Sequence, residues 1–153
     1  NKNIAKGSAT IYNSSISVTN KKLYTQPFQY RMRAYVIING QKKYSNWSPM
    51  KKYIPGSVIK SIKRANRYAS SGKLKWNKIA GAKTYTVYWR TKAGGKWKVV
   101  AKNVKGTSAN VKFKPSASFN YYYVKANKVK FGKKSYNSSA DSKILDIYQI
   151  RKY

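Results

Sequence analysis

Polar and apolar residues alternate along most of this chain, and that alternation restricts its fold more than any other feature. Four segments show it clearly: 72–76, 85–90, 96–99 and 111–114. In each of them aromatic or aliphatic residues recur with a period of two, which is typical of half-buried β-strands. No stretch carries a long 3.6-residue period. The alternation therefore predicts an all-β fold.

Two glycine-containing turns mark places where β-hairpins should form. Asn39-Gly40 follows Val36–Ile38, and Ala93-Gly94-Gly95 separates segment 85–90 from segment 96–99. Glycine accepts the positive φ angles that a tight turn requires, so we expect a hairpin at each turn. Residues 58–68 are the best helical candidate, and the preceding Pro55-Gly56 suits an interdomain linker equally well.

The residue types that are missing exclude most catalytic chemistry. The chain has no Cys, His or Glu, and its acidic residues are Asp141 and Asp146. Nucleophilic catalysis normally needs a base beside the nucleophile, and glycoside hydrolysis needs two carboxylates across one bond. Zinc needs Cys or His, and calcium needs clustered oxygen ligands. We therefore expect no enzyme, no catalytic residue, no metal and no cofactor.

The chain contains an internal repeat at an offset of 92 residues (Tyr30 to Tyr122). Segment 30–34 matches segment 122–126, and further identities in the same register are Gly40 with Gly132, Lys42 with Lys134 and Tyr44 with Tyr136. A period of this size suits a β-sandwich domain of about 100 residues.

The repeat predicts two units of unequal completeness. Residues 56–153 hold one complete domain, and residues 1–55 hold only the C-terminal part of another, about its strands E to G. A half sandwich exposes its core face and its strand edges. Two explanations stay open: either the chain is a fragment of a longer protein, or a partner chain supplies the missing strands.

Several motifs resemble those of one known family. Leu74-Lys75-Trp76, the run Ala80 to Arg90, Gly94 to Trp97 and the run Tyr121 to Ala126 are similar to strands B, C, C′ and F of fibronectin type III domains. The resemblance implies an immunoglobulin-like β-sandwich. Lys-rich, Tyr-rich copies of this kind resemble C-terminal repeats of secreted or surface proteins of Gram-positive bacteria, which implies an extracellular location.

The chain departs from the family pattern at two places. Phe119 and Asn120 stand where the family has a corner tyrosine before strand F, so we expect the corner hydrogen bond to be absent or replaced. The integrin-binding Arg-Gly-Asp motif is missing around residues 129–134, so no integrin binding is implied.

The alternation also assigns a face to each strand residue. The residues expected in the core are Leu74, Trp76, Tyr85, Val87, Trp89, Trp97, Val99, Val111, Phe113, Tyr122, Val124 and Ala126. The opposite face of strands C, C′ and F then presents a predicted ligand site of two tyrosines and four cations: Tyr88, Arg90, Lys96, Lys98, Tyr123 and Lys125. Aromatic planes with interleaved cations suit sugars, phosphates or bases. The alternative is a solvated face with edge-protecting lysines.

The charge of the chain points to anionic partners. It carries 34 Lys and Arg and a net charge of +32. Two secondary basic clusters are Lys60, Lys63, Arg64 and Arg67, and Lys128, Lys130, Lys133 and Lys134. Diffuse positive charge favours attraction to a polyanionic surface. No pattern for sequence-specific nucleic-acid recognition is present, and no apolar run is long enough to span a membrane.

Two functions follow from these observations. The first is a non-catalytic extracellular binding or anchoring module that attaches a larger secreted or surface protein to an anionic polymer or glycan, such as cell wall or acidic glycan. The alternative is a structural spacer or assembly subunit, in which a partner chain completes the first domain. Salt separates them, because binding through counterion release weakens steeply with salt.

Overall fold

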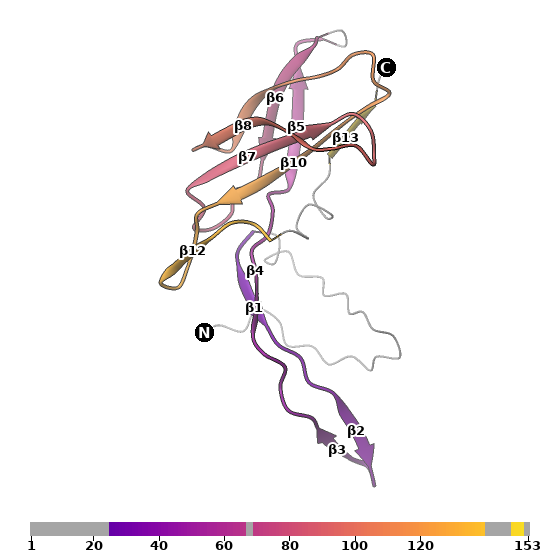
Figure 1. The fold of residues 1–153 in the computed structure, drawn as a ribbon, viewed down its shortest axis with the longest axis vertical. Coiled ribbons are helices and arrows are strands. Elements are labelled where there is room, and N and C mark those ends of the chain that lie inside the picture. The colour runs from indigo at the N-terminus through magenta and orange to yellow at the C-terminus, as the bar shows by residue number, and fades with distance from the viewer. Residues whose placement is uncertain (1–24, 67–68, 140–147, 152–153) are drawn as a thin grey trace.

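The computed structural model describes residues 25–66, 69–139 and 148–151, and every regular element in these ranges is a β-strand. Two larger sheets pack against each other as a sandwich (Figure 1). The three-stranded sheet has the order β5-β6-β9, with β5 Ile59–Arg64, β6 Ser71–Trp76 and β9 Ser108–Lys112. The four-stranded sheet has the order β13-β10-β7-β8, with β7 Thr84–Arg90, β8 Lys98–Val104, β10 Phe119–Asn127 and β13 Tyr148–Arg151.

The chain moves between the two sheets in the immunoglobulin-like manner. It leaves the first sheet after β6, runs through β7 and β8 in the second, returns to the first as β9 and crosses again to β10. All strand pairs of both sheets are antiparallel. The expected all-β, immunoglobulin-like sandwich is therefore confirmed.

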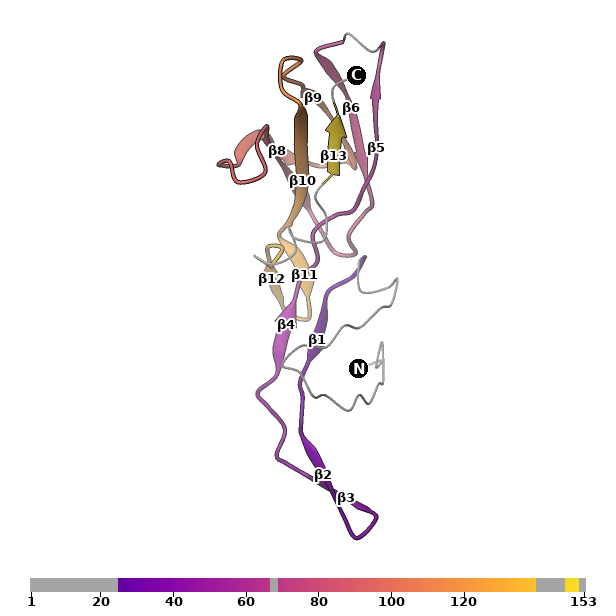
Figure 2. The same ribbon diagram turned by 90° about the vertical axis from the view of Figure 1, so that its right-hand side faces the viewer.

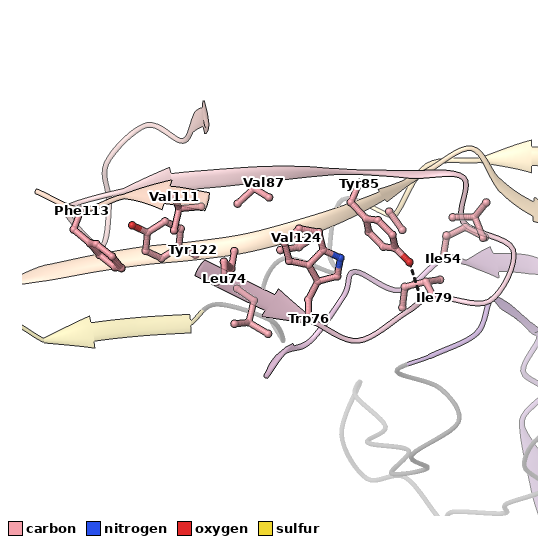
Figure 3. Packing of buried hydrophobic residues seen from close by; sticks show 13 residues of the cluster. Ile54, Leu74, Trp76, Ile79, Tyr85, Val87, Val111, Phe113, Tyr122 and Val124 are labelled. Atoms are coloured by element: carbon pink, nitrogen blue, oxygen red, sulfur yellow. Dashed lines mark hydrogen bonds between the residues drawn. The ribbon is translucent and has the colours of Figure 1, made fainter. Parts of the chain in front are cut away.

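The core lies between the sheets and is built around aromatic residues (Figure 3). Trp76 of β6 packs edge-on against Tyr85 of β7, with ring centroids 5.6 Å apart. The Tyr85 hydroxyl accepts a hydrogen bond of 2.9 Å from the backbone N–H of Ile79. Most of the predicted core is fully buried, namely Leu74, Trp76, Tyr85, Val87, Val111, Phe113, Tyr122, Val124 and Ala126. Trp89 is partly buried against it.

Two predicted core residues are wrongly placed by the alternation. Trp97 lies in the β7–β8 connection rather than in a strand, and it packs on the outer face of the sheet against Tyr123. Val99 is exposed and stands opposite Tyr88. The register of β7 and β8 shifts between the pairs Val87–Ala101 and Tyr88–Val99, so one extra residue in β8 reverses which side chains point inward.

The helix considered for residues 58–68 is also wrong, because β5 occupies residues 59–64. A register shift between Ile59 and Ser61 gives this strand an extra residue. Ile59 then stands opposite Trp76, and Ile62 stands opposite Leu74, so both isoleucines face the core although they are three residues apart. A bulged strand thus imitates the i, i+3 spacing of a helix.

Asn120 replaces the corner tyrosine. Its buried side-chain oxygen accepts hydrogen bonds of 2.9 Å from the indole N–H of Trp89 and from the backbone N–H of Lys114. Its amide donates to the Lys114 carbonyl at 3.3 Å. Two residues further along β10, the Tyr122 hydroxyl donates a 2.6 Å hydrogen bond to the carbonyl of Lys112. The corner between β9 and β10 is therefore fixed by an amide and a phenol together.

Residues 28–53 form a long β-hairpin that extends away from the sandwich (Figure 2). Its strands are β1 Phe28–Tyr30, β2 Tyr35–Ile38, β3 Gln41–Tyr44 and β4 Lys51–Tyr53. The expected turn at Asn39-Gly40 is confirmed, since both residues have positive φ, 49° and 73°, and Ile38 pairs with Gln41 across them. A second, short hairpin follows β10, with strands β11 Val129–Phe131 and β12 Lys134–Tyr136.

The long hairpin joins the sandwich through buried contacts. Ile54, directly after β4, belongs to the sandwich core. Its backbone N–H donates to Ser139 Oγ at 3.0 Å, and its carbonyl accepts the Ser139 N–H at 2.8 Å. Ser138 Oγ donates to the Pro55 carbonyl at 2.8 Å. These bonds tie the base of the hairpin to the edge of β10.

The other glycine turn also connects two antiparallel strands, β7 and β8, but less tightly than expected. The connection covers residues 91–97, and the N–H of Gly95 donates to the Lys92 carbonyl at 3.0 Å within it. This longer loop carries Trp97 over the outer face of the sheet.

Candidate polyanion-binding surface

The predicted aromatic and cationic site lies on the outer face of β7 and β10. Cross-strand pairs join Tyr88 to Tyr123 and Arg90 to Tyr121. Lys125 pairs with Thr86 in the next row. Since paired residues share a face, the structure brings Tyr88, Arg90, Tyr123 and Lys125 together on this face.

The aromatic side chains of this face pack against one another. The rings of Tyr88 and Tyr123 are stacked, with centroids 4.5 Å apart and planes 5° apart. Trp97 meets Tyr123 edge-on at 4.6 Å. The guanidinium of Arg90 lies 4.2 Å from the centroid of the Trp97 ring, and its Nη1 donates to the Gly95 carbonyl at 3.3 Å. Tyr123 is buried as a result, so its ring is not open for stacking on a ligand.

Neither of the two lysines predicted on strand C′ is a strand residue of this face. Lys98 pairs with Trp89, which packs against the core, and so belongs to the opposite face of the sheet from Tyr88. Lys96 is exposed in the β7–β8 connection. The register shift in β8 that exposes Val99 is also the reason that Lys98 faces the other way.

Burial, and to a lesser extent electrostatic repulsion by the neighbouring Tyr88, raises the pKa of Tyr123 to about 12. An unfolded tyrosine ionises near pH 10, so unfolding releases a proton between pH 10 and 12. The contribution of Tyr123 to stability is therefore complete below pH 10. It falls by about 1.4 kcal/mol per pH unit as the pH rises to 12.

This pH dependence is measurable by urea unfolding at pH 9, 10 and 11. We expect Tyr123→Phe, which keeps the stacked ring, to lose stability less steeply above pH 10 than the parent chain does. An identical slope in both proteins would contradict the assignment of this titration to Tyr123.

The structure does not bring the members of the first secondary basic cluster together on one surface. Lys60 and Lys63 are exposed on β5, whereas Arg64 turns toward the core side, its guanidinium 5.5 Å from the centroid of the Phe113 ring. Arg67 lies outside the described residues. The second cluster stays together on the β11–β12 hairpin, where Lys128, Lys130, Lys133 and Lys134 are all exposed.

The structure assembles a basic surface that the sequence did not reveal, on the outer face of the three-stranded sheet. We call it the lysine face. Its exposed members are Lys63, Lys73, Lys75 and Lys112. Lys63 pairs directly with Lys73, Lys75 follows two residues along β6, and Lys112 is the diagonal neighbour of Lys73 through the pair Lys73–Asn110.

The geometry of antiparallel sheets places these four charges close together. Directly paired residues have Cβ atoms about 5 Å apart, and neighbours two residues along a strand or on the diagonal are about 7–8 Å apart. Lys73 is thus the centre of the group, with the other three within about 8 Å. Small polar residues fill the positions between them: Ser61, Ser71, Ser108 and Asn110.

No carboxylate balances this face within the described residues, because both aspartates of the chain lie outside them. Like charges directly opposite each other destabilise a sheet. Protection of sheet edges explains lysines on β5 and β9, but Lys73 and Lys75 stand on the central strand β6. The lysine face therefore has a cost in stability that edge protection does not account for.

The described residues contain no group of three or more metal-ligating side chains. A helix long and apolar enough to cross a membrane is likewise not found among them.

No family model matches the chain, and neither does any curated protein. Among solved structures it is similar to a Fn3-like protein from Clostridium thermocellum, with 24% sequence identity and a TM-score of 0.41. The match covers 56% of this chain and 86% of that protein.

Proposed function

We propose that this chain is a non-catalytic binding module that attaches a larger protein to an anionic polymer through the lysine face. One observation carries the proposal: four exposed lysines meet on one sheet, around Lys73, and the described residues hold no carboxylate to pair with them. An immunoglobulin-like sandwich is a scaffold that hosts many functions, so the proposed function depends on this surface and not on the fold.

The lysine face suits a linear polyanion on physical grounds. Its rows follow neighbouring strands of one sheet, so consecutive anionic groups of one polymer chain can each meet an ammonium group. Every lysine that neutralises such a group releases a condensed counterion, and this release supplies affinity without a dedicated pocket. Lysine also behaves as a mobile point charge, which tolerates variation in the spacing of the anions.

An extracellular location belongs to the same proposal. It rests on the resemblance to Lys-rich repeats of secreted and surface proteins of Gram-positive bacteria. Phosphate-rich wall polymer or acidic glycan would then be the anionic polymer. The predicted site around Tyr88, Arg90, Tyr123 and Lys125 remains a secondary candidate, since Lys125 is only half-buried beside it.

Salt dependence tests the proposal. Binding of the chain to inorganic polyphosphate, to a carboxylated glycan and to double-stranded DNA is measured by fluorescence anisotropy at several salt concentrations. For polyphosphate we expect the logarithm of the affinity to fall linearly with the logarithm of the salt concentration, with a slope of about 3 for four neutralised charges. A slope near zero, or no binding at about 50 mM salt, would rule the function out.

The three polymers also identify the class of ligand. Preference for polyphosphate or glycan over DNA at equal charge density supports a wall or glycan anchor. A clear preference for DNA would replace that anchor with a nucleic-acid-binding role.

A further inference from the structure

The long hairpin presents an apolar surface to solvent. Tyr30, Met32, Val36 and Ile38 stand at alternate positions and are 41%, 55%, 58% and 52% exposed. Alternate residues of an extended chain share a face, so these four form one surface, which we call the apolar hairpin face. A contiguous exposed patch of this kind marks an interaction site more often than chance exposure does.

On the opposite face of the hairpin, arginine side chains lie over aromatic rings. The guanidinium groups of Arg31 and Arg33 both lie 4.4 Å from the centroid of the Trp47 ring. Arg33 also lies 3.7 Å from the ring centroid of Tyr44. These cation–π contacts cover the aromatic rings while leaving charge at the surface. The aromatic rings of this face thus have cationic partners, although Ile37 on the same face is 64% exposed.

The internal repeat shows what the apolar hairpin face corresponds to. Tyr30 and Met32 match Tyr122 and Val124 of β10 in the repeat register. In β10 these two positions are fully buried, at 0% exposure. The same positions of one repeated unit are thus core in the second copy and surface in the first.

Hydrogen bonds support this match, although Ser138 lies one residue beyond the position that matches Ser45. The N–H of Ala34 donates to Ser45 Oγ at 2.9 Å, and the Ser45 N–H donates to the Ala34 carbonyl at 3.0 Å. In the second copy Ala126 and Ser138 make the same two bonds, both at 2.8 Å. The hairpin is therefore the counterpart of β10 and the segment that follows it.

Two things cover β10 in the second copy. The inner face of the three-stranded sheet packs on it, with Phe113 meeting Tyr122 edge-on at a centroid distance of 5.9 Å. Strand β7 pairs with its other edge, placing Trp89 opposite Tyr122 and Val87 opposite Val124. In the described residues β1 has a strand partner on one side alone, which is β4.

We propose that the apolar hairpin face binds an acidic β-sheet of a different polypeptide. That polypeptide adds a strand antiparallel to β1, in the place that β7 takes beside β10, and lays apolar side chains over Tyr30, Met32, Val36 and Ile38. Strand addition supplies main-chain hydrogen bonds, and the alternate side chains supply specificity. This surface is separate from the lysine face, so the inference does not depend on the proposed function.

The charge of the hairpin indicates what kind of polypeptide binds the apolar hairpin face. Around the apolar face the hairpin carries only cations, which are Arg31, Arg33, Lys42, Lys43, Lys51 and Lys52. Two hairpins of the same chain placed face to face would repel. A second copy also cannot lend its three-stranded sheet, because uncovering its own β10 would expose as much apolar surface as the exchange buries. An acidic sheet from another polypeptide gains burial and charge attraction together.

A peptide based on β7 tests the inference. The probe is a fluorescent peptide of residues 82–92 carrying Lys83→Glu, Arg90→Glu and Lys92→Glu, which keeps the alternation of Tyr85, Val87 and Trp89 and becomes acidic. We expect the intact chain to bind it with a Kd below about 100 μM. Met32→Asp should weaken binding at least about tenfold.

The matched control is Val100→Asp, at an exposed position of β8 in the sandwich rather than on the hairpin. It makes the same change of charge, so its affinity should stay close to that of the parent chain. No binding at about 1 mM peptide, or equal losses in both variants, would overturn the inference. Sedimentation equilibrium of the chain alone should show a monomer, and a dimer abolished by Met32→Asp would assign the face to a second copy instead.

Discussion

Replacing Lys63, Lys73, Lys75 and Lys112 with glutamine is expected to lower the affinity for polyphosphate several hundred-fold at about 0.1 M salt. Each neutralised anionic group of a flexible polymer contributes a salt slope of about 0.7, so each lost lysine weakens binding about fivefold at that concentration. All four lysines are exposed, and glutamine keeps most of the side-chain length. Fluorescence anisotropy with labelled polyphosphate measures the loss.

The control removes the same charge elsewhere. Lys42, Lys43, Lys133 and Lys134 are exposed near the ends of the two hairpins, away from the lysine face. Their replacement with glutamine lowers the net charge by the same amount, so a general attraction would weaken equally in both variants. Only a local surface makes the first variant much the weaker binder. Equal losses would mean that binding is diffuse and that the lysine face is not the site.

The same variant should also show what the lysine face costs. Lys63 and Lys73 stand directly opposite each other, and such pairs of like charge destabilise a sheet by about 0.2–1 kcal/mol. The glutamine variant should therefore unfold at the same urea concentration as the parent or at a higher one. Reduced binding in a protein of undiminished stability separates loss of the site from loss of the fold.

The class of fold was predictable from the sequence because it depends on local pattern. Alternation around Leu74, Trp76, Tyr85 and Val87 placed them correctly in the core, and the Asn39-Gly40 turn formed as its residues require. These features need no knowledge of which strands are neighbours. The pattern failed where a bulge added one residue, between Ile59 and Ser61 and between Val99 and Ala101.

The candidate site was much less predictable because it depends on pairing. Lys73 and Lys75 alternate with Leu74 and Trp76, which was a signal that both point outward. Nothing local shows that Lys63 lies beside Lys73, since their pairing follows from the course of β5. The aromatic site was mispredicted for another reason. Tyr88 and Tyr123 do stack, but Trp97 from the β7–β8 loop packs against Tyr123. The path of a loop cannot be predicted from the periodicity of a sequence.

Replacing Asn120 with alanine is expected to lower the free energy of unfolding by about 3 kcal/mol, because buried donors left without partners cost about 1–3 kcal/mol each. The substitution leaves the indole N–H of Trp89 and the backbone N–H of Lys114 without their acceptor. Domains of this size are stable by only about 5–15 kcal/mol, so the loss is a large part of the total. Urea unfolding followed by tryptophan fluorescence measures it.

Two further variants show whether the hydrogen bonds are the cause. Asn137→Ala removes an exposed amide whose oxygen accepts one bond, from the Lys128 N–H at 3.1 Å, and should cost less than about 0.5 kcal/mol. Asn120→Asp keeps an acceptor for both donors but sets a carboxylate against the Lys114 carbonyl, so its stability should lie between those of the parent and Asn120→Ala. If Asn120→Ala were no less stable than Asn137→Ala, the amide would not be what fixes the corner. Because that corner holds the end of β9, which carries Lys112, a loosened corner would also disturb the edge of the lysine face.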